Sequence, residues 1–288
     1  MENPEGYYFK NSNNLFIAFN EWDEDTSKEM VQILEFVKKS FEDIYGEAYV
    51  NNWKIAIKYN KEYPCCSPNY HEIYLAIRKN EINKNYYIGI LIYQFAHELC
   101  HVMIHKDVGI PCNMDKVNKT KSSWFEETIC ELSSLYFLSK LKDDWENFNP
   151  LELNSYTCYE DTKLYYNETI LDLPRDKNEF EFSDYFRIHL NCLELNWKDR
   201  LKNRWCALEM LPIFQNNIKL QKEKSTNLWH EVKNLQKIHD LVYSEKITSF
   251  KDFLYYWQAC SSNHENKTSI HEIIDLFKFT FQRINQSI

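Results

Sequence analysis

Three histidines at intervals of four residues stand out in the segment 94–105, QFAHELCHVMIH. They are His97, His101 and His105, and Glu98 follows the first directly. Residues four apart lie on one face of a helix, so His97 and His101 can direct ring nitrogens at one point. The stretch HELCH also matches the pattern H-E-x-x-H of zinc-binding helices. The spacing therefore predicts that His97 and His101 bind one Zn²⁺ ion.

The glutamate of this motif has a chemical use beside such a metal. Zinc held by three protein ligands keeps a position for water and lowers the pKa of that water towards neutrality. Glu98 lies one step around the helix from His97, near enough to take a proton from the water without being a ligand. We expect Glu98 to be a general base. A histidine-rich helix that binds no metal is the alternative, and a third ligand decides between the two.

Three regions of the sequence offer that third ligand. His105 would lie about 6 Å beyond His101 along a continuous helix, too far to join the same ion, and a histidine there is favoured by the helix dipole. Cys112 and Asp115 lie in the polar stretch 106–123, which we expect to be a loop, and no partner spacing supports either. The acidic segment WFEETICEL, residues 124–132, remains.

With HELCH, this acidic segment resembles the gluzincin metallopeptidases, the zincin class that includes thermolysin and the M1 aminopeptidases. Their second helix supplies a glutamate ligand within a segment like W-x-x-E-x-x-x-E, which Trp124, Glu127 and Glu131 match. The resemblance spans about residues 50 to 140 and implies that Glu127 is the third ligand. It implies that Glu131 orients a ligating imidazole, and the two glutamates share a helix face. Glu126 remains the alternative ligand.

The resemblance carries two further implications, and it assigns no subfamily. Residues 67–77, SPNYHEIYLAI, would form the edge strand that binds an extended peptide by β-augmentation. A tyrosine or histidine downstream would stabilise the oxyanion. Tyr185 and His189, one helical turn apart, are the candidates, and other tyrosines remain possible: Tyr156, Tyr159 and Tyr165.

The elements around the motif are read from hydrophobic periodicity. Residues 27–45 show the spacing of an amphipathic helix, and residues 83–105 that of a buried one. Alternating β-branched and aromatic residues predict strands at 14–22, 52–60 and 71–79. The stretch PCCSPN that joins the last two predicts a turn.

The second half of the chain reads as helical. Residues 122–141 form a strong helix pattern, and breaks follow near Pro150 and at 172–179. From residue 180 the pattern is helical, with an exposed connection at 216–227 and a core-facing aromatic stripe at 252–260.

These patterns predict an α+β protein. We expect an N-terminal lobe, residues 1–115, with a small mixed sheet and the HExxH helix. A helical lobe, residues 116–288, would carry the glutamate ligand. In the terms of the resemblance, this is a zincin-like catalytic unit followed by a helical C-terminal lobe.

The amino-acid composition disfavours several classes of binding partner. The net charge of −9 over 288 residues argues against nucleic acid and anionic membranes, which need a positive surface. The sequence has only four glycines and no glycine-rich motif, which disfavours a phosphate-binding loop. Nine scattered cysteines favour reduced thiols and a cytoplasmic protein, and the adjacent Cys65 and Cys66 are expected to be small, half-buried residues before a turn. Oligomeric state is not encoded in any of these features.

The sequence thus predicts a zinc metallopeptidase that hydrolyses peptide bonds, with Zn²⁺ as its cofactor and a peptide or protein as its substrate. A zincin-fold regulatory or binding protein with a non-catalytic metal site is the alternative.

Overall fold

The structure is a computed structural model of the whole chain. The residues that it describes are 6–9, 12–18, 22–45, 55–67, 72–77, 86–105, 122–144, 155–171, 181–220, 227–244, 246–247, 249–261 and 263–284. The chain divides into two compact units. Unit 1 comprises residues 1–107 and 133–171, and unit 2 comprises residues 108–132 and 172–288. The lobe boundary predicted at 115/116 lies outside the described residues, and the chain returns to unit 1 at residue 133.

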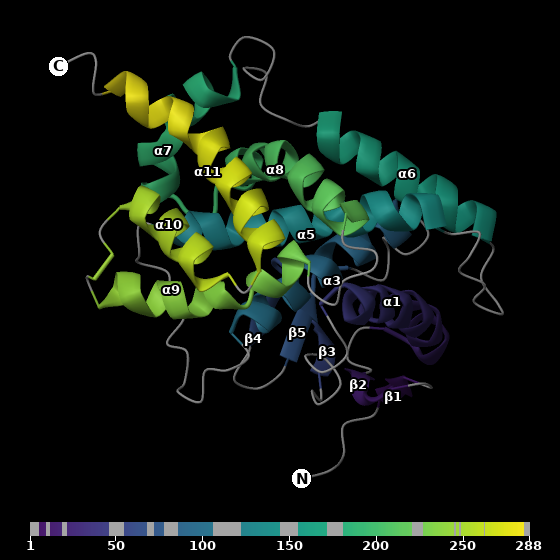
Figure 1. Cartoon of the computed structure of the whole chain (residues 1–288). Coiled ribbons are helices and arrows are strands. Elements are labelled where there is room, and N and C mark those ends of the chain that lie inside the picture. Colours follow the sequence, from purple (N-terminus) through teal and green to yellow (C-terminus); the bar gives the residue numbers. More distant parts are fainter. Residues whose placement is uncertain are drawn as a thin grey trace. The chain divides into compact units, whose positions relative to one another are not determined.

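Unit 1 contains a five-stranded mixed sheet with the strand order β1-β2-β3-β5-β4 (Figure 1). Its strands are β1 (Gly6–Phe9), β2 (Ser12–Ala18), β3 (Ile55–Tyr59), β4 (Cys65–Ser67) and β5 (Glu72–Leu75). The pairs β2–β3 and β3–β5 are parallel, and the outer pairs β1–β2 and β4–β5 are antiparallel. Successive side chains of a strand point to opposite faces of the sheet. Ile57 and Ile73 pair in register and are both buried, so they lie on the face that packs into the core.

Two expectations about this sheet are wrong. Residues 65–67 form strand β4 and not a turn, and β4 pairs antiparallel with β5. Consequently β5 lies between β3 and β4. The strand within residues 67–77 that we expected at the edge of the sheet, β5, is therefore an inner strand. Among the described strands, β4 is the edge on this side. The reason is local: prolines at positions 64 and 68 flank a strand of only three residues, and they hide its signal.

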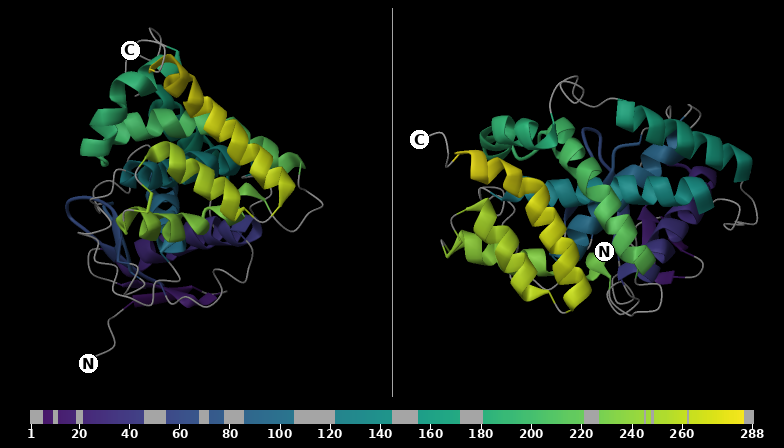
Figure 2. Two further views of the ribbon diagram at one scale, coloured as in Figure 1. Left: turned by 60° about the vertical axis from the view of Figure 1, so that its left-hand side comes forward. Right: turned by 45° about the horizontal axis from the view of Figure 1, so that its top comes forward.

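Three helices of unit 1 pack around the sheet: α1 (Glu24–Tyr45), α3 (Tyr87–Ile104) and α6 (Ser155–Leu171). Helix α1 contacts β1 and β2, α3 contacts β4 and β5, and α1 and α3 contact each other. Figure 2 shows α1, in purple, lying over the first two strands. By length and apolar composition α3 could cross a membrane, yet 89% of it is buried inside the protein. It is therefore the central core helix of unit 1.

The N-terminus of α3 is fixed by α6. The Asp161 carboxylate of α6 accepts hydrogen bonds from the backbone N–H groups of Ile88 (3.3 Å) and Gly89 (3.0 Å). These are among the donors that a helix start leaves without intrahelical partners. The helices also approach closely here, because a Cβ atom on Gly89 would lie 2.4 Å from Cβ of Tyr165. Asp161 and the glycine together set where the HExxH helix begins.

Unit 2 is helical. It contains α7 (Phe182–Leu195), α8 (Arg200–Leu220), the short 3-10 helix η4 (Leu228–Glu231), α9 (Asn234–Tyr243), α10 (Phe250–Cys260) and α11 (His264–Ile284). The expected exposed connection at 216–227 is wrong over 216–220, which belong to α8. Asn217 there is buried and donates a 2.9 Å hydrogen bond to the Ser269 hydroxyl, so a polar residue that reads as surface is part of the core.

The helix α5 (Ser123–Asp144) begins in unit 2 and ends in unit 1. In unit 2, Trp124 and Phe125 are fully buried against aromatic rings of α10 and α11, among them Phe250 and Phe277. The aromatic stripe at 252–260 is amphipathic as expected, with Phe253, Leu254 and Trp257 buried and Tyr255 and Tyr256 exposed. These observations confirm the α+β class with a mixed sheet and a helical second half.

Candidate metal centre

Helix α3 buries every residue of the HELCH motif. The exposed fractions are 5% for His97, 4% for Glu98 and 8% for His101, and His105 at the C-terminal end of the helix is 3% exposed. The rings of His97 and His101 lie with their centroids 5.1 Å apart, as expected for neighbours on one helix face. Polar side chains of this kind are stable inside a protein only when they are hydrogen-bonded, ion-paired or bound to a metal.

Helix α5 packs antiparallel to α3 through two serine hydroxyls. Ser133 Oγ donates a 3.1 Å hydrogen bond to the carbonyl oxygen of Ala96, and Ser134 Oγ donates a 2.9 Å bond to that of Tyr93. Because α5 is one continuous helix, this register also sets its first turns, where the glutamates of the WFEETICEL segment lie. Moving back along α5 corresponds to moving forward along α3.

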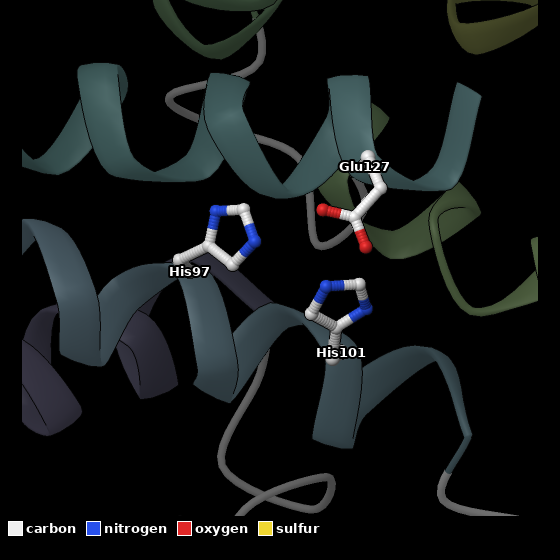
Figure 3. A group of neighbouring side chains, drawn as sticks. All are labelled: His97, His101 and Glu127. Atoms are coloured by element: carbon white, nitrogen blue, oxygen red, sulfur yellow. The ribbon is translucent and has the colours of Figure 1, made fainter. Parts of the chain in front are cut away.

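The register brings Glu127 to the histidines of the motif. One ligand atom from each of His97, His101 and Glu127 lies within 4.8 Å of the other two. Figure 3 shows the two imidazoles rising from α3 and the Glu127 carboxylate reaching down from α5 towards them. A tetrahedral zinc with bonds of about 2.1 Å holds its ligands about 3.4 Å apart, so small side-chain rotations close the group on an ion. Two imidazoles and one carboxylate are a donor set that zinc accepts.

Glu126, the alternative ligand, belongs to a second group. One ligand atom from each of His101, His105 and Glu126 lies within 4.8 Å of the others, and all three residues are buried. Within unit 2, Glu126 Oε2 lies 3.2 Å from Nε2 of His239 on α9. His105 is thus not a partner of His97, as the helix spacing predicts, but it has a group of its own. No sequence pattern links His239 to this segment.

Glu131 lies one turn after Glu127 and contacts two arginines of α8. Its Oε1 accepts a 3.0 Å hydrogen bond from Arg200 Nε, and its Oε2 lies 3.6 Å from Arg204 Nε. Glu131 and Arg204 are buried, whereas about half of the Arg200 side chain is exposed. These pairs hold the carboxylate that we expected to orient an imidazole. The orienting role itself stays a prediction.

Of the residues proposed from the resemblance, Tyr185 lies in the core of unit 2, and His189 is half-buried beside it. Tyr185 is buried, with its ring centroid 4.2 Å from that of His189 and 3.6 Å from that of Trp205. The two residues do share a helix face, and an oxyanion role for either stays a prediction. Tyr159 and Tyr165 lie half-buried on α6, and the Tyr156 side chain lies outside the described residues.

Among the described residues, no cysteine belongs to either group of ligand atoms. Cys65 and Cys66 are half-buried on β4, which confirms their partial burial but not the turn. Cys112 and Asp115 lie outside the described residues.

The chain matches no protein-family model, no curated protein and no solved structure.

Proposed function

We propose that this protein is a zinc-dependent metallopeptidase, with His97, His101 and Glu127 as the zinc ligands and Glu98 as the general base. The observation that carries the proposal is the group of three ligand atoms within 4.8 Å, beside a buried carboxylate that is not part of it. The ligands come from two helices whose register is set by Ser133 and Ser134.

Each residue has one task in the proposed reaction. A zinc ion bound here would lower the pKa of a coordinated water and polarise a peptide carbonyl. Glu98 takes a proton from the water as the oxygen attacks the carbonyl carbon, and then passes that proton to the leaving amine. Burial of Glu98 favours this task, because it keeps competing water away from the carboxylate.

A purely structural zinc site fits these residues less well. Structural sites are closed by four protein ligands, whereas the described group of His97, His101 and Glu127 supplies three and leaves a position for water. A structural site also has no use for an adjacent carboxylate such as Glu98. Burying that carboxylate costs free energy, which a catalytic role would justify.

The sheet offers a place for an extended substrate. Strand β4 is the edge strand beside β5 among the described strands, and it contacts α3, the helix that carries the motif. A peptide that adds to β4 by backbone hydrogen bonds would run next to this helix. The substrate strand proposed from the resemblance is therefore assigned to β4.

The decisive experiment measures zinc content and peptide hydrolysis in the same preparations. The wild type, Glu98→Gln, His101→Ala and the surface control His271→Ala are compared, the last because His271 is half-exposed. We expect about one zinc per chain and cleavage in the wild type and the control. Glu98→Gln should keep zinc and lose about 10²–10⁴-fold in rate, whereas His101→Ala should lose both.

The other outcomes are equally informative. Cleavage at the wild-type rate by Glu98→Gln would refute the general-base assignment. Zinc bound by the wild type without cleavage of any peptide in a broad library would favour the alternative, a regulatory or binding protein with a non-catalytic metal site.

A further inference from the structure

One histidine of the HExxH segment has no task in the proposed peptidase. His105 is buried at the end of α3, one turn beyond His101, and it forms a group with His101 and Glu126. The three ligand atoms of this group lie within 4.8 Å of one another, the same limit that describes His97, His101 and Glu127. The two groups are chemically alike, with two imidazoles and one carboxylate each.

The register of the helices explains why a second group exists. Glu126 precedes Glu127 on α5, and because the two helices are antiparallel it lies on the side of His101 and His105. Histidines repeated at intervals of four keep the same face along the helix. The pattern that builds one ligand pair therefore builds a second, about 6 Å further along the helix axis.

We propose that α3 and α5 hold a second zinc position, formed by His101, His105 and Glu126, in which the metal is unproductive. This inference rests on the proposed function, because it defines the first position as the productive one. A neutral imidazole has a single lone pair for a metal, since its other nitrogen carries the proton. His101 can therefore serve one ion at a time, and the two positions are alternatives for one zinc.

The position of Glu98 makes the second site inactive. Glu98 follows His97 directly, at the far end of the motif from His105. A zinc that moves from the first group to the second exchanges His97, the neighbour of Glu98, for His105, which lies about two helical turns further along α3. Glu98 then lies too far from the ion to accept a proton from water bound to it, because proton transfer requires hydrogen-bond reach.

Glu126 is supported for this role by a contact within unit 2. Its Oε2 lies 3.2 Å from Nε2 of the buried His239 on α9, so a further imidazole lies against this carboxylate. All three residues of the second group are buried, whereas Glu127 of the first group is partly exposed, so the second position is the more enclosed of the two.

The test is zinc affinity, measured by competition with a chromophoric chelator, with zinc alone as the probe. We compare the wild type, His97→Ala, His105→Ala, the double variant of both, and the control His271→Ala. His97→Ala should still bind one zinc, more weakly than the wild type, and it should be inactive. Adding His105→Ala should weaken binding by at least a further tenfold or so, because loss of even an outer-sphere partner costs about 10–100-fold. His105→Ala alone completes the double-mutant cycle, so that the effect of removing His105 is measured with and without His97.

Two results would overturn the inference and leave the peptidase proposal intact. One is a complete loss of zinc binding in His97→Ala, and the other is zinc binding by His97→Ala that does not weaken when His105→Ala is added. Absence of zinc from the wild type would instead remove both proposals together.

A second variant guards against misfolding, because His105 is buried and its alanine variant can unfold. Glu126→Gln in the His97→Ala background keeps the shape of the side chain and removes its charge. It should also weaken zinc binding at least about tenfold, and an unchanged affinity would remove Glu126 from the second position.

Discussion

The close approach of α3 and α6 at Gly89 predicts that Gly89→Ala lowers the free energy of unfolding, whereas the same change in most helices raises it. In the interior of an ordinary helix, Gly→Ala stabilises a protein by about 0.5–1 kcal/mol, because glycine loses more backbone freedom on folding. Here the added Cβ would lie 2.4 Å from Cβ and 2.8 Å from Cγ of Tyr165. Neither atom is the far end of a flexible side chain, so the helices themselves must separate.

The magnitude follows from these two opposing contributions. Overpacking of this kind destabilises by about 1–3 kcal/mol, which exceeds the gain in helix propensity. We therefore expect Gly89→Ala to lower the free energy of unfolding by about 1–2 kcal/mol. For a protein of this size that corresponds to a fall of about 2–8 °C in Tm.

Urea unfolding followed by circular dichroism measures this change as a lower midpoint at an unchanged slope. A double-mutant cycle with Tyr165→Gly isolates the contact, because that change removes both atoms that the added Cβ would meet. In the Tyr165→Gly background, Gly89→Ala should become neutral or stabilising. If Gly89→Ala stabilises the otherwise unchanged protein, the close packing of α3 on α6 is wrong.

Three further substitutions test the contacts that hold α3 and α5 in place. Ser133→Ala with Ser134→Ala removes two buried hydrogen bonds to α3, and we expect a loss of about 1 kcal/mol each in urea unfolding together with weaker zinc binding by chelator competition. Glu131→Gln removes the negative charge that lies 3.6 Å from the buried Arg204 Nε. It should destabilise by about 3 kcal/mol in the same assay, and an unchanged midpoint would show that the pair is not formed. Burial raises the pKa of the Asp161 carboxyl, against hydrogen bonds from the start of α3 that lower it. The folded state therefore holds this proton more tightly than the unfolded chain, so the contribution of Asp161 to stability should decrease as pH rises through that raised pKa. Thermal unfolding across this range should lose that dependence in Asp161→Asn.

Helices could be predicted from the sequence where periodicity was strong. Residues 27–45 and 83–105 correspond to α1 and α3 to within a few residues at each end, because an apolar stripe of helical period leaves no other element that buries it. Strand β4 could not be predicted, because three residues between prolines carry almost no alternation. Because β4 was not predicted, β5 was wrongly expected at the edge of the sheet.

The residues of the candidate site also differ in how far the sequence predicts them. The grouping of His97 and His101 could be predicted because their spacing is local, and that of Glu127 because its segment resembles that of a known class, while the role of Glu98 stays a prediction. His239 and Arg204 could not be found, since their contacts with Glu126 and Glu131 join residues far apart in the chain with no spacing rule between them. Nor does the sequence reveal that one histidine serves two groups, because that depends on the register of α5 on α3.

The uninterrupted helix α5 has a consequence for cooperativity. Its first turns are held by the aromatic core around Trp124 and Phe125, and its later turns by the serine contacts to α3. Unit 2 cannot melt without exposing the start of a helix on which unit 1 also depends, and the reverse holds as well. Helix formation is cooperative along the chain, so loss of one half penalises the other. A protein of two units should therefore unfold in calorimetry as a single transition, with equal calorimetric and van't Hoff enthalpies.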